Sequence, residues 1–572
     1  MKKALFFLQL MFLIFLSKPV DGRIIHVPSD SSTIQKGING AEAGDTVLVA
    51  LGIYSTATNG EIFPINIKCG VILLSEAGAE DTWIFADYDT TVIRCLDVDS
   101  TTIIRGFRIS KGNSTKGGGI YCENSSIKIT DNEISYNEAT KGGGIYCENS
   151  STKIIDNGIS YNKAIYGAGI YCQGGSPTME NNVVAYDSTI PDNGYGAGIY
   201  CLESSARITN NQIKDNIIRI RHYYPEGYGG GIYCENSSNV EILDNLIEGN
   251  TIFGIYMDVS RGHGYGAGIC CIQCAAALIT RNIIINNHIG FTHGTNYGGG
   301  IYCSLCTQSK VAYNLITENE PQGMRSDNSL AFTANNNTIT SNVSYGIDCY
   351  FSNMDIYNNI ITDNSNRGIK WGSGSTLGIS YNDVWNNSGG NFLNCPPGVG
   401  DTTWGVNYNS TPCDSFYNIS RDPLFHTHPD SLYNLQVESP CIDAGDSLSP
   451  DDPDGTIADM GAFYYDQRTE VTNEDEAIGI TGFELFQNYP NPFNSVTQIR
   501  YELPKESNVQ LTVYNILGQK VAILTNERQA RGLKIMTWEG KDDKGREVAS
   551  GIYFYRIEVG DFVETRKMLL LK

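Results

Sequence analysis

Residues 142–147 read Gly-Gly-Gly-Ile-Tyr-Cys, and close copies of this hexapeptide recur along the chain. The isoleucine of each copy stands at position 120, 145, 170, 199, 232 or 301, and the variant Gly-Ala-Gly-Ile-Cys-Cys surrounds Ile269. A second motif, Asn-x-[Ile/Val]-x-x-[Asn/Asp], has its first asparagine at 132, 157, 182, 211, 245, 282, 314, 337, 359 and 382. Ten matches at intervals of 22 to 37 residues indicate a repeat architecture.

Each repeat unit reads as three very short strands. In one unit these lie near Ile134, near 145–147 and near 152–154. Runs of two to four alternating residues bounded by Asn and Gly cannot form helices. A unit of this size cannot bury its apolar side alone, so the units are expected to stack, each strand pairing with its copy about 4.8 Å away. Ten coils predict a rod of roughly 50 Å.

Side-chain alternation assigns two faces to the hexapeptide strand. Ile and Cys share one side, which predicts a buried column of Cys122, Cys147, Cys172, Cys201, Cys234, Cys271 and Cys303. Tyr takes the other side, which predicts an outward, carbohydrate-binding column of Tyr121, Tyr146, Tyr171, Tyr200, Tyr233 and Tyr302. The first Asn of each unit is expected at a bend, in a left-handed conformation, with the amides hydrogen-bonded along the rod.

The repeats resemble the right-handed parallel β-helix of the pectin lyase-like superfamily. The stretches Ile25-His-Val-Pro-Ser-Asp30 and Gly44-Asp-Thr-Val-Leu-Val49 look like the start of such folds. The resemblance covers residues 23–395 and implies an all-β fold of ten or more coils, with an N-terminal helical cap near 32–41. Residues 396–466 lose the period and are predicted to close the β-helix. The fold hosts lyases, hydrolases, esterases and non-catalytic proteins, so it does not assign a function.

The C-terminal part has a different composition. Residues 467–479 read as an acidic linker, and 480–572 as a small Ig-like β-sandwich. The runs 483–494, 514–521 and 549–555, which include Tyr489-Pro-Asn-Pro-Phe493, resemble the C-terminal sorting domain of the bacterial type IX secretion system. That resemblance implies passage through the periplasm and outer membrane to the cell surface or the medium. An ordinary Ig-like spacer is the alternative.

The N-terminus and the net charge limit the location and the partners. Residues 1–22, with Lys2 and Lys3 before an apolar run, predict a secretory signal peptide rather than an uncleaved anchor. No later stretch is long and apolar enough to span a membrane, so none is expected in the mature chain. A net charge of 40 − 63 = −23 disfavours nucleic acid and anionic membranes as partners. We expect a monomer.

Three consecutive repeat intervals are longer than the rest and predict side-by-side loops at 217–228, 251–265 and 288–297. Candidate catalytic residues in this cluster are Arg219, Arg221, His222, His263 and His293. Arg can pair with a sugar carboxylate and His can move a proton, as β-elimination of a uronate polymer requires. The alternative is that these loops are variable, solvated segments without a role.

Three functions therefore remain open. The first is a surface or secreted protein that binds extracellular polysaccharide without cleaving it. The second is an enzyme at the 217–297 cluster, for which a polysaccharide lyase is favoured over a glycoside hydrolase. The third is a structural surface protein or adhesin.

The cysteines and one acidic loop raise the question of cross-links and metals. Cys271-Ile-Gln-Cys274 and Cys303-Ser-Leu-Cys306 fall in adjacent coils. Buried thiols with one or two disulfides are predicted, and structural zinc is the alternative. No cofactor is certain, but Asp451, Asp452, Asp454 and Asp459 are candidate Ca²⁺ ligands, with a solvated acidic loop as the alternative.

Overall fold

The computed structural model describes residues 22–88, 90–190, 194–220, 226–254, 262–291, 294–372, 374–375, 378–426, 432–470, 483–486, 488, 493, 497–515, 518–529, 532–549, 551–560 and 562–570. The predicted signal peptide, apart from Gly22, lies outside these residues, as does 471–479 of the predicted linker. The chain divides into two compact units, residues 1–468 and 469–572.

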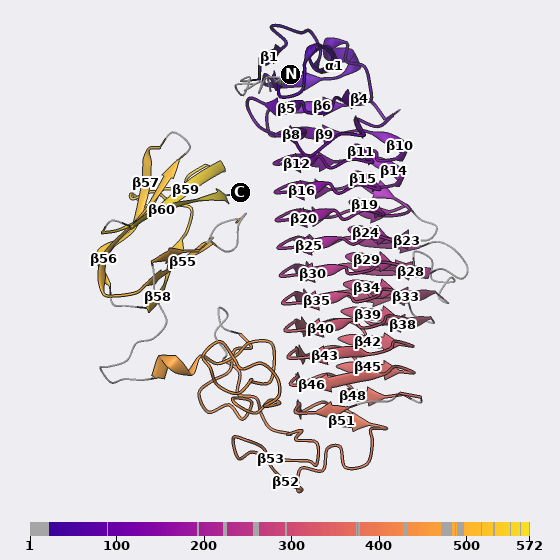
Figure 1. Cartoon of the computed structure of the whole chain (residues 1–572), viewed down its shortest axis with the longest axis vertical. Coiled ribbons are helices and arrows are strands. Elements are labelled where there is room, and N and C mark those ends of the chain that lie inside the picture. Colours follow the sequence, from indigo (N-terminus) through magenta and orange to yellow (C-terminus); the bar gives the residue numbers. More distant parts are fainter. Residues whose placement is uncertain are drawn as a thin grey trace, which may run out of the picture. The chain divides into compact units, whose positions relative to one another are not determined.

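The first unit is a parallel β-helix with three long sheets (Figure 1). Sheet A has 14 strands, from β1 (Ile24–Val27) to β49 (Ile379–Ser380). Sheet B has 13, from β3 (Gly52–Tyr54) to β50 (Asp383–Trp385), and sheet C has 13, from β4 (Ile65–Ile67) to β51 (Gly390–Leu393). One coil runs from β15 (Ile145–Glu148) in sheet C to β16 (Lys153–Ile155) in sheet A and β17 (Gly158–Ser160) in sheet B.

The repeats stack in register, as the sequence predicts. Ile120 pairs with Ile145, Tyr121 with Tyr146 and Cys122 with Cys147. All seven cysteines of the predicted column are buried in the interior, together with the isoleucines of the hexapeptides. The all-β, parallel β-helical class is confirmed.

Two ladders of asparagine side chains run along the inside of the corners. The backbone N and Nδ2 of Asn132 donate to Oδ1 of Asn157 at 3.0 and 3.1 Å, and Asn137 makes the same pair of bonds to Asn162. The amide stacking is confirmed. The prediction that the asparagine itself is left-handed is wrong. The positive φ belongs to Asp131, the residue before Asn132. The preceding residue turns the corner so that the asparagine can point inward.

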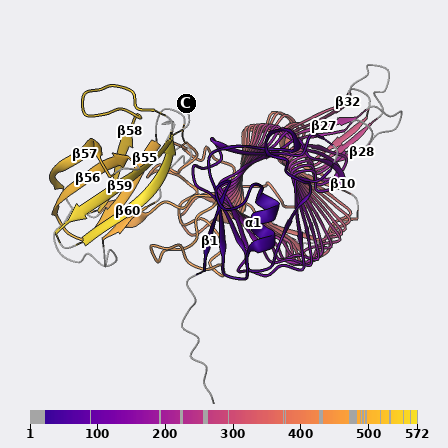
Figure 2. The same ribbon diagram turned by 90° about the horizontal axis from the view of Figure 1, so that it is seen from above.

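The long repeats form an extra two-layered lobe, which we call the fin (Figure 2). Its outer sheet has seven strands, from β10 (Asn113–Lys116) to β37 (His288–Gly290). Its return sheet consists of β23 (Gly194–Tyr195), β28 (Glu226–Tyr228), β33 (His263–Tyr265) and β38 (Thr295–Tyr297). Ile218, Ile252 and Ile289 pack in its core. The prediction of loops at 217–228, 251–265 and 288–297 is therefore wrong for the described parts, which pair as strands.

Both ends of the β-helix are covered. Helix α1 (Ile34–Gly40) lies in the first coil, where predicted, with Thr33 as its N-cap and the Glu61 carboxylate accepting from Ile34 N at 2.7 Å. A short second helix, α2 (Thr56–Asn59), follows β3. The described residues of the closing segment, 396–466, have little regular structure beyond the β52 (Gly405–Val406) and β53 (Pro412–Cys413) pair.

The second unit contains two antiparallel sheets. One consists of β54 (Glu484–Leu485), β55 (Thr497–Leu503) and β58 (Gly532–Trp538). The other consists of β57 (Lys520–Gln529), β56 (Ser507–Asn515), β59 (Gly551–Val559) and β60 (Phe562–Leu570). Alternate residues such as Leu511, Val513 and Tyr555 form one buried core.

Candidate functional site

The tyrosines predicted to form an exposed column are covered. Tyr146 is 0% exposed and Tyr233 is 2% exposed, and Tyr171, Tyr200 and Tyr302 are buried with them. They do point away from the β-helix interior, but a second layer of tyrosines packs over them. We call these five buried residues the inner column. The prediction that they form an open carbohydrate-stacking platform is wrong, and only Tyr121 stays half-buried.

The covering layer is a second row of half-buried tyrosines, which we call the tyrosine strip. Its members are Tyr166, Tyr195, Tyr228, Tyr265 and Tyr297. Ring centroids of successive members lie 5.1, 5.5, 4.8 and 5.9 Å apart. The strip follows the coil repeat along the base of the fin. The sequence does contain a signal for it, since each member directly precedes the first glycine of a hexapeptide.

The strip presents phenol groups with free hydrogen-bonding capacity. Tyr228 donates to Glu226 Oε2 at 2.9 Å. The hydroxyls of Tyr166, Tyr195, Tyr265 and Tyr297 make no hydrogen bond to any residue that the structure describes. Burial raises the pKa of Tyr195, and burial followed by the Glu226 hydrogen bond raises that of Tyr228, so both phenols stay protonated donors.

Cations flank the strip at both ends. Lys141 Nζ lies 5.8 Å from the Tyr166 ring centroid. At the other end, Arg325 Cζ lies 3.8 Å from the Tyr297 ring centroid. These are cation–π distances, so both cations pack on tyrosine faces.

Arg325 belongs to a buried ion-pair network in sheet C. Its Nε and Nη2 bond Asp327 at 3.0 and 2.9 Å, and its Nη1 bonds Asp348 at 2.5 Å. Lys370 Nζ lies 3.2 Å from Asp348 Oδ1, and the Tyr302 hydroxyl donates to Asp327 at 2.9 Å. Two cations and two carboxylates make the network neutral. It closes the lower end of the inner column.

Only two of the five candidate catalytic residues, Arg219 and His263, are described, and these two do not face each other. Arg219 lies on β27 (Ile217–Ile220), where Ile218 and Ile220 enter the fin core, so Arg219 faces out from the seven-stranded sheet. On β33 it is Gly264 that faces Ile289 and Phe291 of that core, so His263 faces out from the return sheet. Arg219 and His263 therefore lie on opposite faces. Arg221, His222 and His293 lie outside the described residues.

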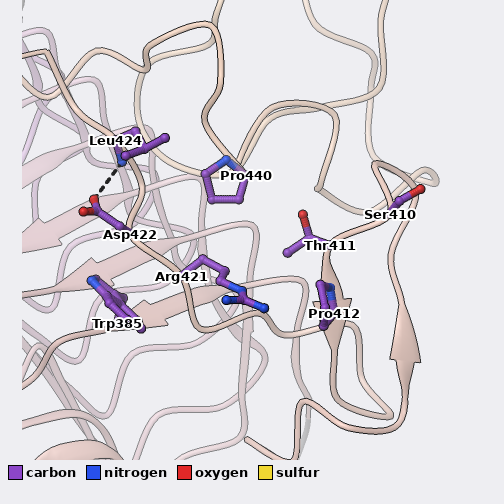
Figure 3. Close-up of a pocket in the computed structure, with 8 residues that line it drawn as sticks. All are labelled: Trp385, Ser410, Thr411, Pro412, Arg421, Asp422, Leu424 and Pro440. Atoms are coloured by element: carbon purple, nitrogen blue, oxygen red, sulfur yellow. Dashed lines mark hydrogen bonds between the residues drawn. The ribbon is translucent and has the colours of Figure 1, made fainter.

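An open cavity of about 470 Å³ lies where β50 meets the closing segment (Figure 3). Its lining residues are Trp385, Ser410, Thr411, Pro412, Arg421, Asp422, Leu424 and Pro440. The sequence analysis predicts no binding site at any of these residues. Trp385 belongs to β50, but the other seven come from the aperiodic closing segment, where spacing gives no guide to contacts.

The cysteine and aspartate predictions have different outcomes. All sixteen cysteines are unpaired, so the prediction of one or two disulfides is wrong for this structure. Among the described residues, no group of three or more His, Cys, Asp or Glu side chains is arranged to hold a metal ion. Asp459 accepts from Asp443 N and Tyr465 N, and its Oδ atoms thereby order the closing segment. Calcium binding at Asp451, Asp452, Asp454 and Asp459 stays a prediction from sequence.

Comparison with known families agrees with this architecture. A model of the right-handed β-helix region matches residues 118–264, and the family of the periplasmic copper-binding protein NosD matches 261–395. A secretion-system C-terminal sorting domain matches 487–571. The first unit is a right-handed β-helix, and the second is a type IX secretion sorting domain. A comparison with curated proteins gives no match.

Several solved structures show a weak likeness to this chain. The periplasmic alginate epimerase AlgG is 14% identical, with a TM-score of 0.30 over 66% of this chain and 82% of its own. Pectate lyase Pel9A is 14% identical, with a TM-score of 0.33 over 77% and 96%. The A-module of the mannuronan C-5 epimerase AlgE4 from Azotobacter vinelandii is 14% identical, with a TM-score of 0.30 over 64% and 93%. These scores carry no argument about function.

The sorting domain sets the location of the protein. It marks the chain for export by the type IX secretion system, to the cell surface or the medium. In the described part of the chain, no helix has the length and apolarity that a membrane crossing needs. The predicted export route is confirmed.

Proposed function

We propose that the exported protein binds an extracellular polysaccharide along the tyrosine strip without cleaving it. The observation that carries this proposal is the row of four tyrosines, Tyr166, Tyr195, Tyr265 and Tyr297, whose phenol hydroxyls have no partner in the described protein. They repeat with the coils, so a polymer with a regular repeat can meet equivalent donors at successive steps. Phenols combine an apolar ring with a polar tip, which suits the mixed surface of a sugar.

Charge on both sides of the strip is compatible with binding rather than catalysis. Glu226 is bonded to Tyr228, and Arg325 is neutralised by Asp327 and Asp348. A general acid or base needs a group within hydrogen-bond reach of the reacting atom, with a pKa near the working pH. The two described fin candidates, Arg219 and His263, face apart and so do not form a convergent pair, which supports binding.

The test removes hydroxyls while it keeps the rings. A Tyr166→Phe, Tyr195→Phe, Tyr265→Phe triple variant retains the ring packing of the strip. Each lost hydrogen bond contributes about 0.5–1.5 kcal/mol, so retention in affinity electrophoresis on a glycan panel is expected to weaken at least about tenfold. The matched control changes Tyr136, Tyr161 and Tyr186 to Phe. These three also stack, at 5.2 Å spacing, but are 46–57% exposed at another corner of the β-helix.

Three results would overturn the proposal. Equal retention of the triple variant and the control variant would show that the tyrosine strip does not bind the glycan. Release of unsaturated ends from a uronate polymer, seen as a rise in ultraviolet absorbance, would show a lyase. No retention of the native protein on any glycan would favour a structural or adhesive role.

A further inference from the structure

The cavity beside Trp385 is built by a defined backbone connection. Residues 419–421 run along the edge of β50, where Ile419 pairs with Asp383. Arg421 N donates to Asp383 Oδ1 at 3.1 Å, and Ser420 Oγ donates to Val384 O at 2.9 Å. These bonds hold the Arg421 backbone beside Trp385. The cavity wall therefore belongs to the last coil of the β-helix as well as to the closing segment.

The Arg421 guanidinium makes no ion pair or hydrogen bond with a described residue, and the charge of Arg421 acts on the buried Asp383 carboxyl only at longer range. This is notable in a chain with 63 acidic and 40 basic residues. The neighbouring carboxylate of Asp422 is engaged instead by Leu424 N, at 3.0 Å. Figure 3 shows the Arg421 side chain extending from beside Trp385 toward Pro412. An exposed guanidinium with all its donors free is suited to an anionic ligand.

The rest of the lining suits the body of a sugar. Trp385 is half-buried and supplies an apolar ring, and Pro412 and Pro440 supply further apolar walls. The side-chain hydroxyls of Ser410 and Thr411 make no hydrogen bond within the described protein. About 470 Å³ falls within the range of small-ligand pockets. Apolar rings with a few convergent polar groups are the usual composition of such sites.

We propose that this cavity is a second binding site, which takes one sugar residue carrying a carboxylate or a sulfate group. The anion pairs with the Arg421 guanidinium, the sugar ring packs against Trp385, and its hydroxyl groups meet Ser410 and Thr411. The site is independent of the tyrosine strip and of the proposed function.

The test uses the full-length protein and short ligands in titration calorimetry. The probes are a trigalacturonate, a sulfated disaccharide and the neutral counterpart of each. The first two distinguish a carboxylate from a sulfate as the group that binds. Binding of at least one anionic probe is expected, at least tenfold tighter than that of its neutral counterpart. Arg421→Gln is expected to reduce that affinity at least tenfold, and Trp385→Leu to reduce it severalfold.

Two controls separate this site from other effects. Arg105→Gln removes an exposed arginine on sheet A, paired with Asp131, and is expected to leave binding unchanged. The triple Phe variant of the tyrosine strip is also expected to bind the short anions normally, so the two proposals can fail separately. Unchanged affinity in Arg421→Gln, equal binding of neutral probes, or no binding of either anion would overturn the assignment. Arg421 is exposed and its backbone bond to Asp383 persists in the variant, so its substitution does not threaten folding.

Discussion

Asp187 interrupts an asparagine ladder at the position next to Asn162. Its Oδ1 accepts from Asn162 N and Nδ2 at 2.7 and 3.1 Å, as an asparagine would. Its Oδ2, however, is buried and has no hydrogen-bond partner. In the neighbouring rungs this atom is an amide nitrogen, which donates to Ile134 O from Asn162 and to Val184 O from Asn216. A carboxyl oxygen, which can donate only when it is protonated, therefore lies where the ladder needs a donor.

We predict that Asp187→Asn stabilises the β-helix. Burial raises the pKa of Asp187 well above its usual range. The folded protein thus holds a proton that the unfolded chain, with a pKa of about 3.9, has lost. The stability contributed by that proton is complete at low pH and is lost as the pH rises through the folded-state pKa. At neutral pH the variant should gain about 1–3 kcal/mol, because its amide donates without a buried carboxyl having to stay protonated.

Urea unfolding between pH 4 and pH 8 measures this. The wild-type midpoint should fall as the pH rises, and the Asp187→Asn midpoint should fall less. Asn216→Asp, which places a carboxyl on the next rung, is expected to destabilise the protein instead. Equal pH profiles for wild type and Asp187→Asn would contradict the argument.

A glycine at the start of a hexapeptide is predicted to be irreplaceable. Gly142 has φ of 65°, and a Cβ there would lie 2.5 Å from Ile145 O. A left-handed non-glycine residue costs about 1–3 kcal/mol, and the contact with Ile145 adds to it. Gly142→Ala should lower the thermal midpoint clearly. Gly158 in the same coil has open space at its Cβ position, so Gly158→Ala should change the midpoint little or raise it. A larger fall in the thermal midpoint for Gly158→Ala than for Gly142→Ala would contradict this prediction.

The Arg325 network is predicted to be essential for stability although it lies beside the proposed binding surface. Arg325→Met leaves Asp327 and Asp348 buried without their main cation. Loss of one partner of a buried pair costs about 3–5 kcal/mol. Arg528, which is 68% exposed and pairs with Glu506, is the matched control. Arg528→Met should cost no more than about 1 kcal/mol in the unfolding of its own unit. A similar loss of unfolding free energy in Arg325→Met and Arg528→Met would contradict the prediction that the buried pair matters more.

Thiol titration tests the absence of disulfides. Only Cys69 is exposed, and fourteen of the other cysteines are buried. Contacts with the flanking thiols of Cys147 and Cys95, together with burial, raise the pKa of Cys122 well above its usual range, so its thiol stays protonated and unreactive. The native protein should show one fast-reacting thiol, which Cys69→Ser removes. Full denaturation without reductant should release sixteen. A lower number would show a disulfide that this structure lacks.

The repeat was predictable because its determinants are local. Side chains alternate along a strand, so Ile145 and Cys147 face one side and Tyr146 the other. Because successive coils pair in register, equivalent residues form columns. The same alternation could not show that Tyr146 would be covered. Lys116 Nζ lies 5.2 Å from the Tyr146 ring centroid, and Lys116 belongs to the preceding coil, which alternation within one strand does not relate to Tyr146.

The fin and the cavity escaped prediction for two different reasons. Residues 217–220 read Ile-Ile-Arg-Ile, and Ile218 is buried by apolar side chains such as Ile252 that come from neighbouring coils. The inserts at 217–228, 251–265 and 288–297 were therefore predicted as loops. Arg421 and Trp385 meet through an aperiodic segment, in which no spacing rule relates the two.

The identity of neighbouring coils has a genetic consequence. Residues 116–126 and 141–151 have the same eleven amino acids, and they occupy the same place in successive coils. Unequal crossing-over between the two encoding segments would insert or excise a whole 25-residue turn while every remaining pair kept its partner. Related genes could thus change the length of the β-helix by one coil at a time. The distance between the fin and the N-terminal end of the β-helix would change with it.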